Sequence, residues 1–246
     1  MSSYLITGSS RGIGLDLVRL LASKPSTEVA VVFAAARTQT DALTKLVAQS
    51  YRRVHQVKMD VTDDRIIASA AATVEKVLAG RGLDVLVNNA GVMPFTPAAI
   101  STQSDLDSTF RTNVTSAHMV TSAFLPLLKR GTLKKVVNVS STFGSIARAS
   151  RFVRAAAPAY KFTKAALSML TVQYAQSFAR EGFIFMIISP GWVRTGLGGD
   201  NADLTPEQSA TAVFDLISSA TSAHNGRFYD IFVDGWGFYD GAEVPW

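Results

Sequence analysis

Seven short apolar runs recur along the chain, and segments with the periodicity of helices separate them. The runs are nearly continuous in Val, Ile, Leu and Phe, which is typical of strands buried on both faces of a parallel sheet. These predicted strands lie at residues 4–7, 29–35, 53–59, 83–89, 134–140, 183–189 and 227–233. The predicted helices lie at about 11–23, 41–50, 63–80, 103–130, 157–181 and 206–221. This alternation predicts a single α/β domain over residues 1–246, a doubly wound, mostly parallel sheet with helices on both faces.

Composition limits the class of protein without indicating an activity. Apolar residues make up 48% of the 246 residues and charged residues 17%, and no window approaches the ~18 uninterrupted apolar residues of a membrane span. The start of the chain does not resemble a secretory signal. The sequence contains no cysteine, which excludes disulfides and thiolate sites and suits a reducing compartment. We therefore expect a cytoplasmic protein that does not attach to a membrane.

The charge and the histidines indicate neither a nucleic-acid partner nor a metal. The net charge is +5, but the basic residues are spread along the chain, and an anionic small ligand explains the excess equally well. His55, His118 and His224 lie far apart, without the spacing of metal ligands.

The first predicted strand continues into the glycine-rich segment TGSSRGIG. Gly8 permits a tight turn, Gly12 lets the backbone approach a pyrophosphate, and Gly14 allows close packing of the following helix. The spacing differs from the common G-x-G-x-x-G pattern, so this turn alone fits a dinucleotide site and a purely structural turn equally well. The second strand ends in FAAAR, without the acidic residue that would hold the ribose of NAD. Arg37 and Arg11 would instead hold a 2′-phosphate, which favours NADP(H); two solvated arginines are the alternative.

Tyr160 and Lys164 stand four residues apart at the start of an alanine-rich predicted helix. Side chains at i and i+4 project from one face of a helix, so the two can share a ligand. A fixed positive charge beside a phenol favours the phenolate and lowers the tyrosine pKa from ~10 toward neutrality. The pair therefore predicts proton transfer, although the same spacing also occurs on ordinary amphipathic helices.

Taken in order, the motifs resemble those of the short-chain dehydrogenase/reductase family over essentially the whole chain. TGSSRGIG is similar to the family's TGxxxGxG turn, MDVTD to its adenine-side Asp-Val pair, NNAG to its strand-four motif, and NVSS to its catalytic serine. YKFTK is similar to YxxxK, and SPGWVRT to the Pro-Gly segment after the sixth strand. The joint order and spacing carry the resemblance, because each motif alone is modest.

This resemblance implies roles for the matching residues. Ser141 would hydrogen-bond the substrate oxygen, Tyr160 would donate the proton, and Asn113 would hold a water of a proton relay. Lys164 would bind the nicotinamide ribose and lower the pKa of Tyr160. Residues implied to bind NADP(H), besides Tyr160 and Lys164, are Gly8, Ser10, Arg11, Gly12, Ile13, Gly14, Arg37, Asp60, Val61, Asn88, Ala90, Gly91, Pro190, Gly191, Val193 and Thr195.

A long segment between Ser141 and Tyr160 resembles the carbonyl-reductase-like branch of the family, and within it polyketide ketoreductases similar to norsolorinic acid ketoreductase. Three arginines in this segment either form a solvated loop face or attract an acidic substrate; they are Arg148, Arg151 and Arg154. Bulky residues at the predicted mouth suit a flat apolar carbonyl compound or ordinary packing; they are Met93, Phe95, Phe143, Trp192 and Leu197.

We therefore expect an NADPH-dependent carbonyl reductase, an oxidoreductase acting on the CH–OH group, whose substrate is a ketone or aldehyde such as an aromatic polyketide ketone. An alcohol dehydrogenase working oxidatively and a non-catalytic NADP(H)-sensing protein are the alternatives.

The resemblance also implies a homodimer or homotetramer through the helices at about 103–130 and 157–181. Two irregular segments follow the fourth and sixth strands, PFTPAAI and the region from Ser189 to Gln208, and the second is interpreted as a mobile lid.

Overall fold

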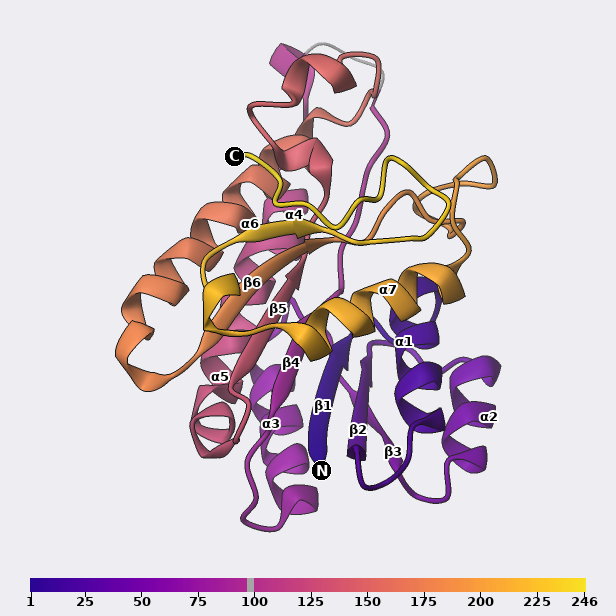
Figure 1. Ribbon diagram of the computed structural model, residues 1–246, viewed down its shortest axis with the longest axis vertical. Helices are drawn as coiled ribbons and strands as arrows, with labels where there is room; N and C mark the ends of the chain where they lie inside the picture. The colour runs from indigo at the N-terminus through magenta and orange to yellow at the C-terminus, as the bar shows by residue number, and fades with distance from the viewer. Residues whose placement is uncertain (97–99) are drawn as a thin grey trace.

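The computed structural model describes residues 1–96 and 100–246, and its seven named strands form one sheet in the order β3-β2-β1-β4-β5-β6-β7. Each neighbouring pair in this order is parallel, so the predicted doubly wound fold is confirmed (Figure 1). The strands are β1 (Ser2–Thr7), β2 (Val29–Ala36), β3 (Val54–Lys58), β4 (Val85–Asn88), β5 (Lys135–Val139), β6 (Ile184–Ser189) and β7 (Phe228–Asp230).

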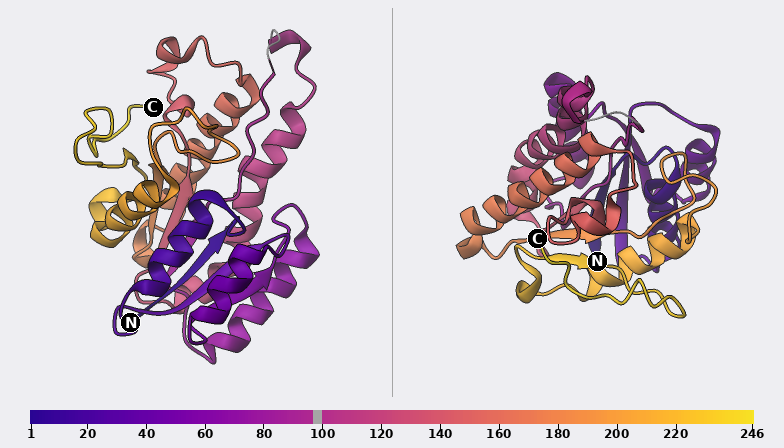
Figure 2. Two further views of the ribbon diagram at one scale, coloured as in Figure 1. Left: turned by 90° about the vertical axis from the view of Figure 1, so that its right-hand side faces the viewer. Right: turned by 90° about the horizontal axis from the view of Figure 1, so that it is seen from above.

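Helices cover both faces of this sheet (Figure 2). One face packs against α1 (Gly12–Ser23), α2 (Asp41–Gln49) and α7 (Pro206–Ser219), and the other against α3 (Asp64–Leu78), α5 (Ser116–Arg130) and α6 (Pro158–Ser177). Successive side chains of a strand point to opposite faces, so the fully buried Leu5 and Ile6 of β1 belong to separate apolar clusters. Burial on both sides explains why the strand sequences are apolar without alternation.

Two helices begin where the sequence carries clear start signals. Pro158 and Pro206 occupy the first turns of α6 and α7, where a missing N–H costs nothing. Thr205 also caps α7 reciprocally with Gln208, each side chain accepting from the backbone N–H of the other residue. These signals set the directions in which both helices leave the carboxyl edge of the sheet.

The long helix predicted at 103–130 is interrupted. A short helix α4 (Leu106–Phe110) leads into a π-helical turn at Arg111–Thr115, and α5 follows. The wider turn contains Asn113, whose side chain bonds the backbone of Val92 beyond β4. Periodicity alone does not predict this interruption, because it depends on a contact with a distant segment.

Two other predicted elements are shorter than expected. The helix predicted at 157–181 ends at Ser177, and a 3₁₀ turn at Ala179–Glu181 leads to Gly182 with φ of 75°. The seventh strand stops at Asp230, where the chain turns and its last residues return antiparallel, with the Asp230 N–H donating to Ala242.

Because the strands are parallel, their carboxyl ends share one edge of the sheet, and the glycine turn and the segments after β4, β5 and β6 continue from this edge. The segments after β4 and β5 extend above the sheet in Figure 1. Ligands of open parallel sheets bind at this edge. Residues 97–99 of the irregular PFTPAAI segment lie outside the described residues. Among the helices in the described part of the chain, none is long and apolar enough to span a membrane.

Candidate active site

Tyr160 and Lys164 lie on the same face of α6 and are almost fully buried, at 7% and 5% exposure. The Lys164 ammonium donates to the carbonyl of Val139 at 2.8 Å and lies 5.4 Å from the centre of the Tyr160 ring. The hydroxyl of Ser141, just after β5, lies close enough to that of Tyr160 to lower the pKa of the phenol. The structure therefore brings the predicted serine, tyrosine and lysine together.

Gly144 explains how Ser141 comes so close to α6. A side chain at this position would place its Cβ 2.7 Å from the carbonyl carbon of Lys164 and 2.8 Å from its Cβ. Only glycine lets the short turn Thr142–Gly144 lie directly on the helix, and Ser141 caps this turn by accepting from the N–H of Phe143 at 3.2 Å. The sequence analysis missed Gly144, although its position three residues after the serine was a usable signal.

The pKa values of the pair correct one expectation. Burial raises the pKa of Tyr160 to about 12, against a smaller lowering by the Ser141 hydrogen bond, and burial lowers the pKa of Lys164 to about 8. Burial is thus the largest influence on the Tyr160 pKa in this structure, and the predicted lowering toward neutrality by Lys164 is not seen. At neutral pH the phenol keeps its proton and is available as a donor.

Asn113 is also at this site, but its side chain is fully engaged. Its Oδ1 accepts from the Val92 N–H at 2.9 Å, and its Nδ2 donates to the Val92 carbonyl at 2.9 Å and to the Thr163 hydroxyl at 3.0 Å. Thr163 lies on α6 between Tyr160 and Lys164. Asn113 therefore connects the segment after β4 to the helix that carries the tyrosine.

The glycine turn forms an open cradle before α1. Gly8 and Gly12 adopt positive φ values of 70° and 56°, which favour glycine. A Cβ on Gly14 would lie 2.5 Å from the Gly8 carbonyl oxygen and 2.6 Å from Nδ2 of Asn89. Among the described residues no side chain caps the amino end of α1, so its first N–H groups remain for an anion. The cradle fits a pyrophosphate.

The side chains of the two asparagines in NNAG have different hydrogen-bond partners. Nδ2 of Asn88 donates to Thr121 at 3.0 Å and to Asn138 at 2.9 Å, so this predicted cofactor-binding side chain lies inside the protein. Asn89, which the sequence analysis did not select, donates to the carbonyl of Thr7 at 2.8 Å and holds the glycine turn. Strand alternation could have separated the two, since consecutive side chains point to opposite faces.

Ala90 and Gly91 join the glycine turn to the catalytic pair. The Ala90 N–H donates to the Thr7 hydroxyl at 3.0 Å, and its Cα lies 3.0 Å from where a Cβ on Gly8 would stand. A Cβ on Gly91 would lie 3.2 Å from Oδ1 of Asn113 and 3.8 Å from Nζ of Lys164. One continuous backbone path thus runs from the cradle to the lysine. Ser10, Ile13 and Val61, also predicted to bind cofactor, are partly exposed.

Asp60 and Arg37 lie near each other at the carboxyl ends of β3 and β2. Hydrogen bonds from the hydroxyl and N–H of Thr62 hold the pKa of Asp60 below its usual range, and the charge of Arg37 adds to this lowering. Both Thr62 bonds end on Oδ1 of Asp60. Arg37 and Arg11 are exposed, in agreement with a charged ligand and equally with solvation.

The segment after β6 approaches the glycine turn. Thr195 accepts the N–H groups of Leu197 and Gly198 on its hydroxyl, while its methyl lies 3.1 Å from where a Cβ on Gly12 would stand. Pro190 accepts from the Ser209 hydroxyl at 2.7 Å, and Val193 is buried. Thr195 of this segment thus faces the cradle, whereas Pro190 is bonded to α7 and Val193 is buried.

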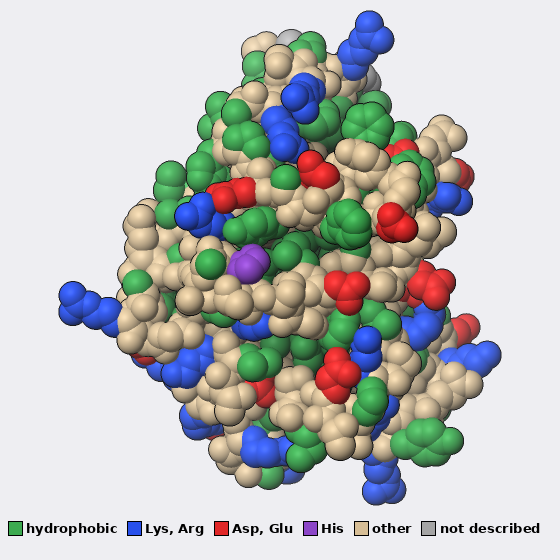
Figure 3. Space-filling model, in the orientation of Figure 1, with side chains coloured by type: hydrophobic (Ala, Val, Ile, Leu, Met, Phe, Trp, Pro, Cys, Tyr) green, Lys and Arg blue, Asp and Glu red, His purple; other side chains and the backbone are tan. Residues whose placement is uncertain are grey.

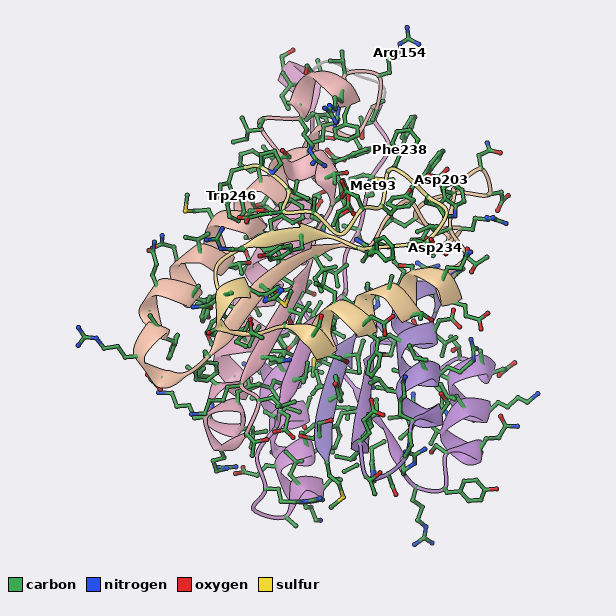
Figure 4. All side chains as sticks on the ribbon, in the orientation of Figure 1. Met93, Arg154, Asp203, Asp234, Phe238 and Trp246 are labelled. Atoms are coloured by element: carbon green, nitrogen blue, oxygen red, sulfur yellow. The ribbon has the colours of Figure 1, made fainter. Side chains whose placement is uncertain are left out.

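The segment between Ser141 and Tyr160 forms one wall of the mouth. The rings of Phe143 and Phe152 have centroids 4.6 Å apart, and Phe143 meets Tyr160 edge-on at 6.3 Å. The C-terminal segment is bonded to this wall, since the Trp246 carbonyl accepts from the N–H of Ala147 at 2.8 Å. Figure 4 shows Met93 and Phe238 above the carboxyl ends of the strands, and Figure 3 shows apolar side chains among the charged ones on this part of the surface.

Comparison with known proteins agrees with this geometry. The family model described as short chain dehydrogenase matches residues 3–204. The chain belongs to the short-chain dehydrogenase family. It is 36% identical over 202 residues to the short-chain dehydrogenase/reductase AacuF of Aspergillus aculeatus, covering 78% of this chain and 74% of that protein. An uncharacterized oxidoreductase of Schizosaccharomyces pombe is 34% identical, covering 98% of this chain and 97% of its own.

Among solved structures, the NADPH-bound carbonyl reductase from chicken fatty liver superposes with a TM-score of 0.88 at 30% identity, covering 100% of this chain and 99% of that one. The predicted family and its carbonyl-reductase-like branch are confirmed. As a member of this family, the chain is an oxidoreductase.

Asp230, at the end of β7, predicts a measurable pH dependence of stability. Burial raises its pKa to about 6 despite hydrogen bonds from Ile231 and Ser189. The folded state therefore holds the proton more tightly than the unfolded chain, so the stabilisation is present below about pH 4 and is lost as pH rises through 6. We expect Asp230→Asn to raise the free energy of unfolding at pH 8 by on the order of 1–2 kcal/mol.

Denaturant unfolding at pH 8 and pH 4.5 checks this expectation. The gain in Asp230→Asn should shrink at the lower pH, whereas Asp234→Asn, at an exposed position in Figure 4, should change little at either. A gain of the same size at both pH values would contradict the titration of Asp230.

Proposed function

We propose that this protein is an NADPH-dependent carbonyl reductase that reduces a ketone or aldehyde. The observation that carries the proposal is the buried Tyr160 phenol, which lies next to Ser141 and Lys164 at the end of the backbone path that leaves the glycine cradle. Conversion of a carbonyl to an alcohol needs a group that stabilises charge on the oxygen and a proton donor, both in preorganised positions. Ser141 and Tyr160 supply these two functions.

NADP(H) would be held by residues on both sides of this path. The pyrophosphate would bind in the cradle formed by Gly8, Gly12 and Gly14 and the amino end of α1. The 2′-phosphate would bind to Arg11 and Arg37. Asp60 would accept from the adenine amino group through the oxygen that Thr62 leaves open. Val61 would lie beside Asp60 at the adenine, and Ser10 and Ile13 belong to the glycine turn. Asn88, through its backbone, Ala90 and Gly91 would line the cofactor along β4. The residues that would border the nicotinamide are Pro190, Gly191, Val193 and Thr195. When bound, the reduced nicotinamide supplies the hydride.

Each side chain of the catalytic set has one task in this proposal. Ser141 donates a hydrogen bond to the carbonyl oxygen of the substrate, and Tyr160 gives that oxygen a proton. Lys164, anchored on the Val139 carbonyl, uses its other N–H bonds for ribose hydroxyls. Because the Asn113 side chain is engaged, the water of the relay would bind its main-chain carbonyl instead.

The protonation state of Tyr160 is the one that reduction needs. A phenol with a raised pKa keeps its proton at pH 7 and can give it to the substrate oxygen. A non-catalytic NADP(H) sensor would need no serine, tyrosine and lysine in contact. Reduction is therefore the function we favour.

The mouth supports a flat apolar carbonyl compound as the substrate, an aromatic polyketide ketone being one candidate. Phe143 lies directly against Tyr160, and Phe95 and Trp192 are at least half exposed. Of the three arginines, Arg151 and Arg154 are exposed, which favours a solvated loop face over a site for an acidic substrate.

Our proposal includes a homodimer or homotetramer that buries the face shared by α4 and α6. Phe162 and Met169 on this face are 51% and 61% exposed, and Phe110 contacts Phe162 with ring centroids 6.0 Å apart. Association would remove these apolar side chains from water. The absence of cysteine from the sequence suits the proposed cytoplasmic location and a single 1–246 domain that needs no disulfide.

A cofactor titration followed by a turnover assay tests the function. The purified protein is titrated with NADPH and NADH by fluorescence, and aromatic ketones and quinones are then added while the absorbance of the reduced cofactor is followed. Turnover of NADPH supports the reductase. Tight binding without turnover on any carbonyl would overturn it in favour of the sensor.

Arg37→Asp is expected to reverse the cofactor preference. The change removes a charge-assisted contact to the 2′-phosphate and introduces the acidic residue that would hold a 2′-hydroxyl, so affinity for NADPH should fall by about 10- to 100-fold while that for NADH rises. Dissociation constants of both cofactors measure the effect. Arg180→Asp, at an exposed arginine beyond α6, is the matched control and should change neither. An unchanged preference would show that Arg37 is only a solvated surface residue.

A further inference from the structure

Tyr239, in the segment that returns after β7, is a buried phenol with two polar partners. It is 7% exposed, its hydroxyl donates to Oδ2 of Asp203 at 2.6 Å, and the same oxygen accepts the N–H of Trp192 at 3.1 Å. No step of the proposed reaction uses it. Figure 4 shows Asp203 at the same upper end of the molecule as Met93 and Phe238.

These partners belong to the two sides of one loop. The segment from Gly191 to Thr205, here called the lid, begins and ends in a narrow neck, where Leu204 donates to the Trp192 carbonyl at 3.0 Å and Arg194 donates to the Leu204 carbonyl at 2.9 Å. Trp192 lies on the outgoing side of this neck and Asp203 on the returning side. A single hydroxyl therefore ties both sides to the C-terminal segment.

The Tyr239 ring also supports the backbone at the beginning of the lid. Gly191 has a φ of 79°, and a Cβ there would lie 2.7 Å from Cδ1 of Leu204 and 3.2 Å from Cε1 of Tyr239. The peptide of Gly191 thus packs on the ring without an intervening side chain. Two residues further, Val193 begins the part of the wall that faces the glycine turn through Thr195.

We propose that Tyr239 is a positioning residue that sets the active-site wall from Gly191 to Thr195 by holding the neck of the lid closed. This inference rests on the proposed function, because that wall borders the proposed nicotinamide site. Tyr239 touches neither the reacting atoms nor the proposed cofactor, and it acts through the Trp192 N–H and the Asp203 carboxylate.

The ionisation of the Tyr239 hydroxyl is consistent with its role of holding the two sides of the neck together. Burial, followed by the hydrogen bond to Asp203, raises the Tyr239 pKa well above its ordinary value. The hydroxyl therefore keeps its proton at neutral pH and remains a donor to Asp203. Hydrogen bonds to a charged acceptor in this geometry are stronger than neutral ones.

Tyr239→Phe tests the clamp, because it retains the ring beneath Gly191 and removes only the hydroxyl. Arg194 is the only lysine or arginine between Glu181 and Arg227, so trypsin reports opening of the neck by cutting after it. We expect cleavage there to be about tenfold faster relative to cleavage after the exposed Arg154. Tyr174→Phe removes a hydroxyl that bonds His118 and Ser122 on the α5–α6 side, and should leave the ratio unchanged.

The kinetic expectation separates positioning from stability. Tyr239→Phe should raise KM for the carbonyl substrate and the dissociation constant of NADPH by about tenfold, with kcat changed less than threefold. Asp203→Ala should give a similar effect, and the double variant should be no worse than either single variant. Additive effects in the double variant would overturn the clamp.

The protease measurement does not depend on turnover. If the wild-type protein reduces no carbonyl, the proposed function fails, while faster cleavage at Arg194 in Tyr239→Phe still supports the clamp. If the wild type is active and the variant matches it in the cleavage ratio, KM and NADPH affinity, the clamp is refuted and the proposed function stands.

Discussion

Tyr160→Phe is expected to lower turnover of carbonyl substrates by about 10²–10⁴-fold, because a positioned acid contributes a factor of this size. The variant keeps the ring that meets Phe143 edge-on and loses only the hydroxyl beside Ser141. Its dissociation constant for NADPH should stay within about threefold of wild type, since the phenol makes few of the proposed cofactor contacts. Steady-state rates at saturating NADPH, with a fluorescence titration of the same samples, measure both.

The control for this experiment is Tyr174→Phe, which removes a phenol hydroxyl from the far half of α6 and should keep full activity. A Tyr160→Phe protein that keeps more than a tenth of wild-type turnover would show that another group delivers the proton. Loss of NADPH binding in the same variant would instead point to a distorted cradle, which the circular dichroism and melting temperature of the variant would reveal.

Asp84→Asn is expected to cost the largest stability of any substitution considered, about 3 kcal/mol or more. Asp84 is 6% exposed, and its carboxylate accepts from the N–H and hydroxyl of Ser3 and of Thr132 at 2.8–2.9 Å. These bonds tie together the beginnings of β1, β4 and β5 at the edge opposite the active site. An amide keeps one acceptor and turns a donor toward groups that already donate. Urea unfolding at pH 7 measures the loss.

The pH dependence gives a second test of this carboxylate. Burial alone would raise the Asp84 pKa, but the hydrogen bonds from Thr132 and Ser3 outweigh it, so its pKa is held below the usual value. Stabilisation from Asp84 is then present above the unfolded pKa near 4 and is lost as pH falls through the lower folded pKa. The difference between wild type and Asp84→Asn should therefore be constant from pH 6 to 8 and shrink below pH 4. A difference that persists in acid would assign the loss to packing instead.

Local interactions account for most of what could be predicted about the fold. Continuous apolar runs at 29–35 and 183–189 predict strands buried on both faces because helices must cover a parallel sheet. Pro206 favours the start of a helix because its ring fixes φ near the helical value and leaves no N–H that needs a partner. The interruption of the helix at 103–130 could not be predicted, because the partner of Asn113 is Val92, twenty-one residues earlier in the chain.

The residues of the candidate site were also predictable only where local interactions place them. Tyr160 and Lys164 were predictable because one helical turn sets their relation. Gly8, Gly12 and Gly14 were predictable because the backbone conformation of the turn and its close packing on the helix require glycine. Asn89 was missed although it holds that turn, since its contact with Thr7 joins two strands. Tyr239 was missed for the same reason, with its partner Asp203 thirty-six residues away.

By itself, the sequence determined the doubly wound fold, the family and the residues that meet at the carboxyl edge, because periodicity and motif spacing are local properties of the chain. Only the tertiary structure decided how strongly the site is desolvated. In water, a phenolate and an ammonium four residues apart stabilise each other's charge. In the folded protein, burial disfavours both charged forms, so it raises the pKa of Tyr160 to about 12 and lowers that of Lys164 to about 8. Every segment that packs around the pair contributes to its burial, so burial cannot be predicted from the spacing of the two residues.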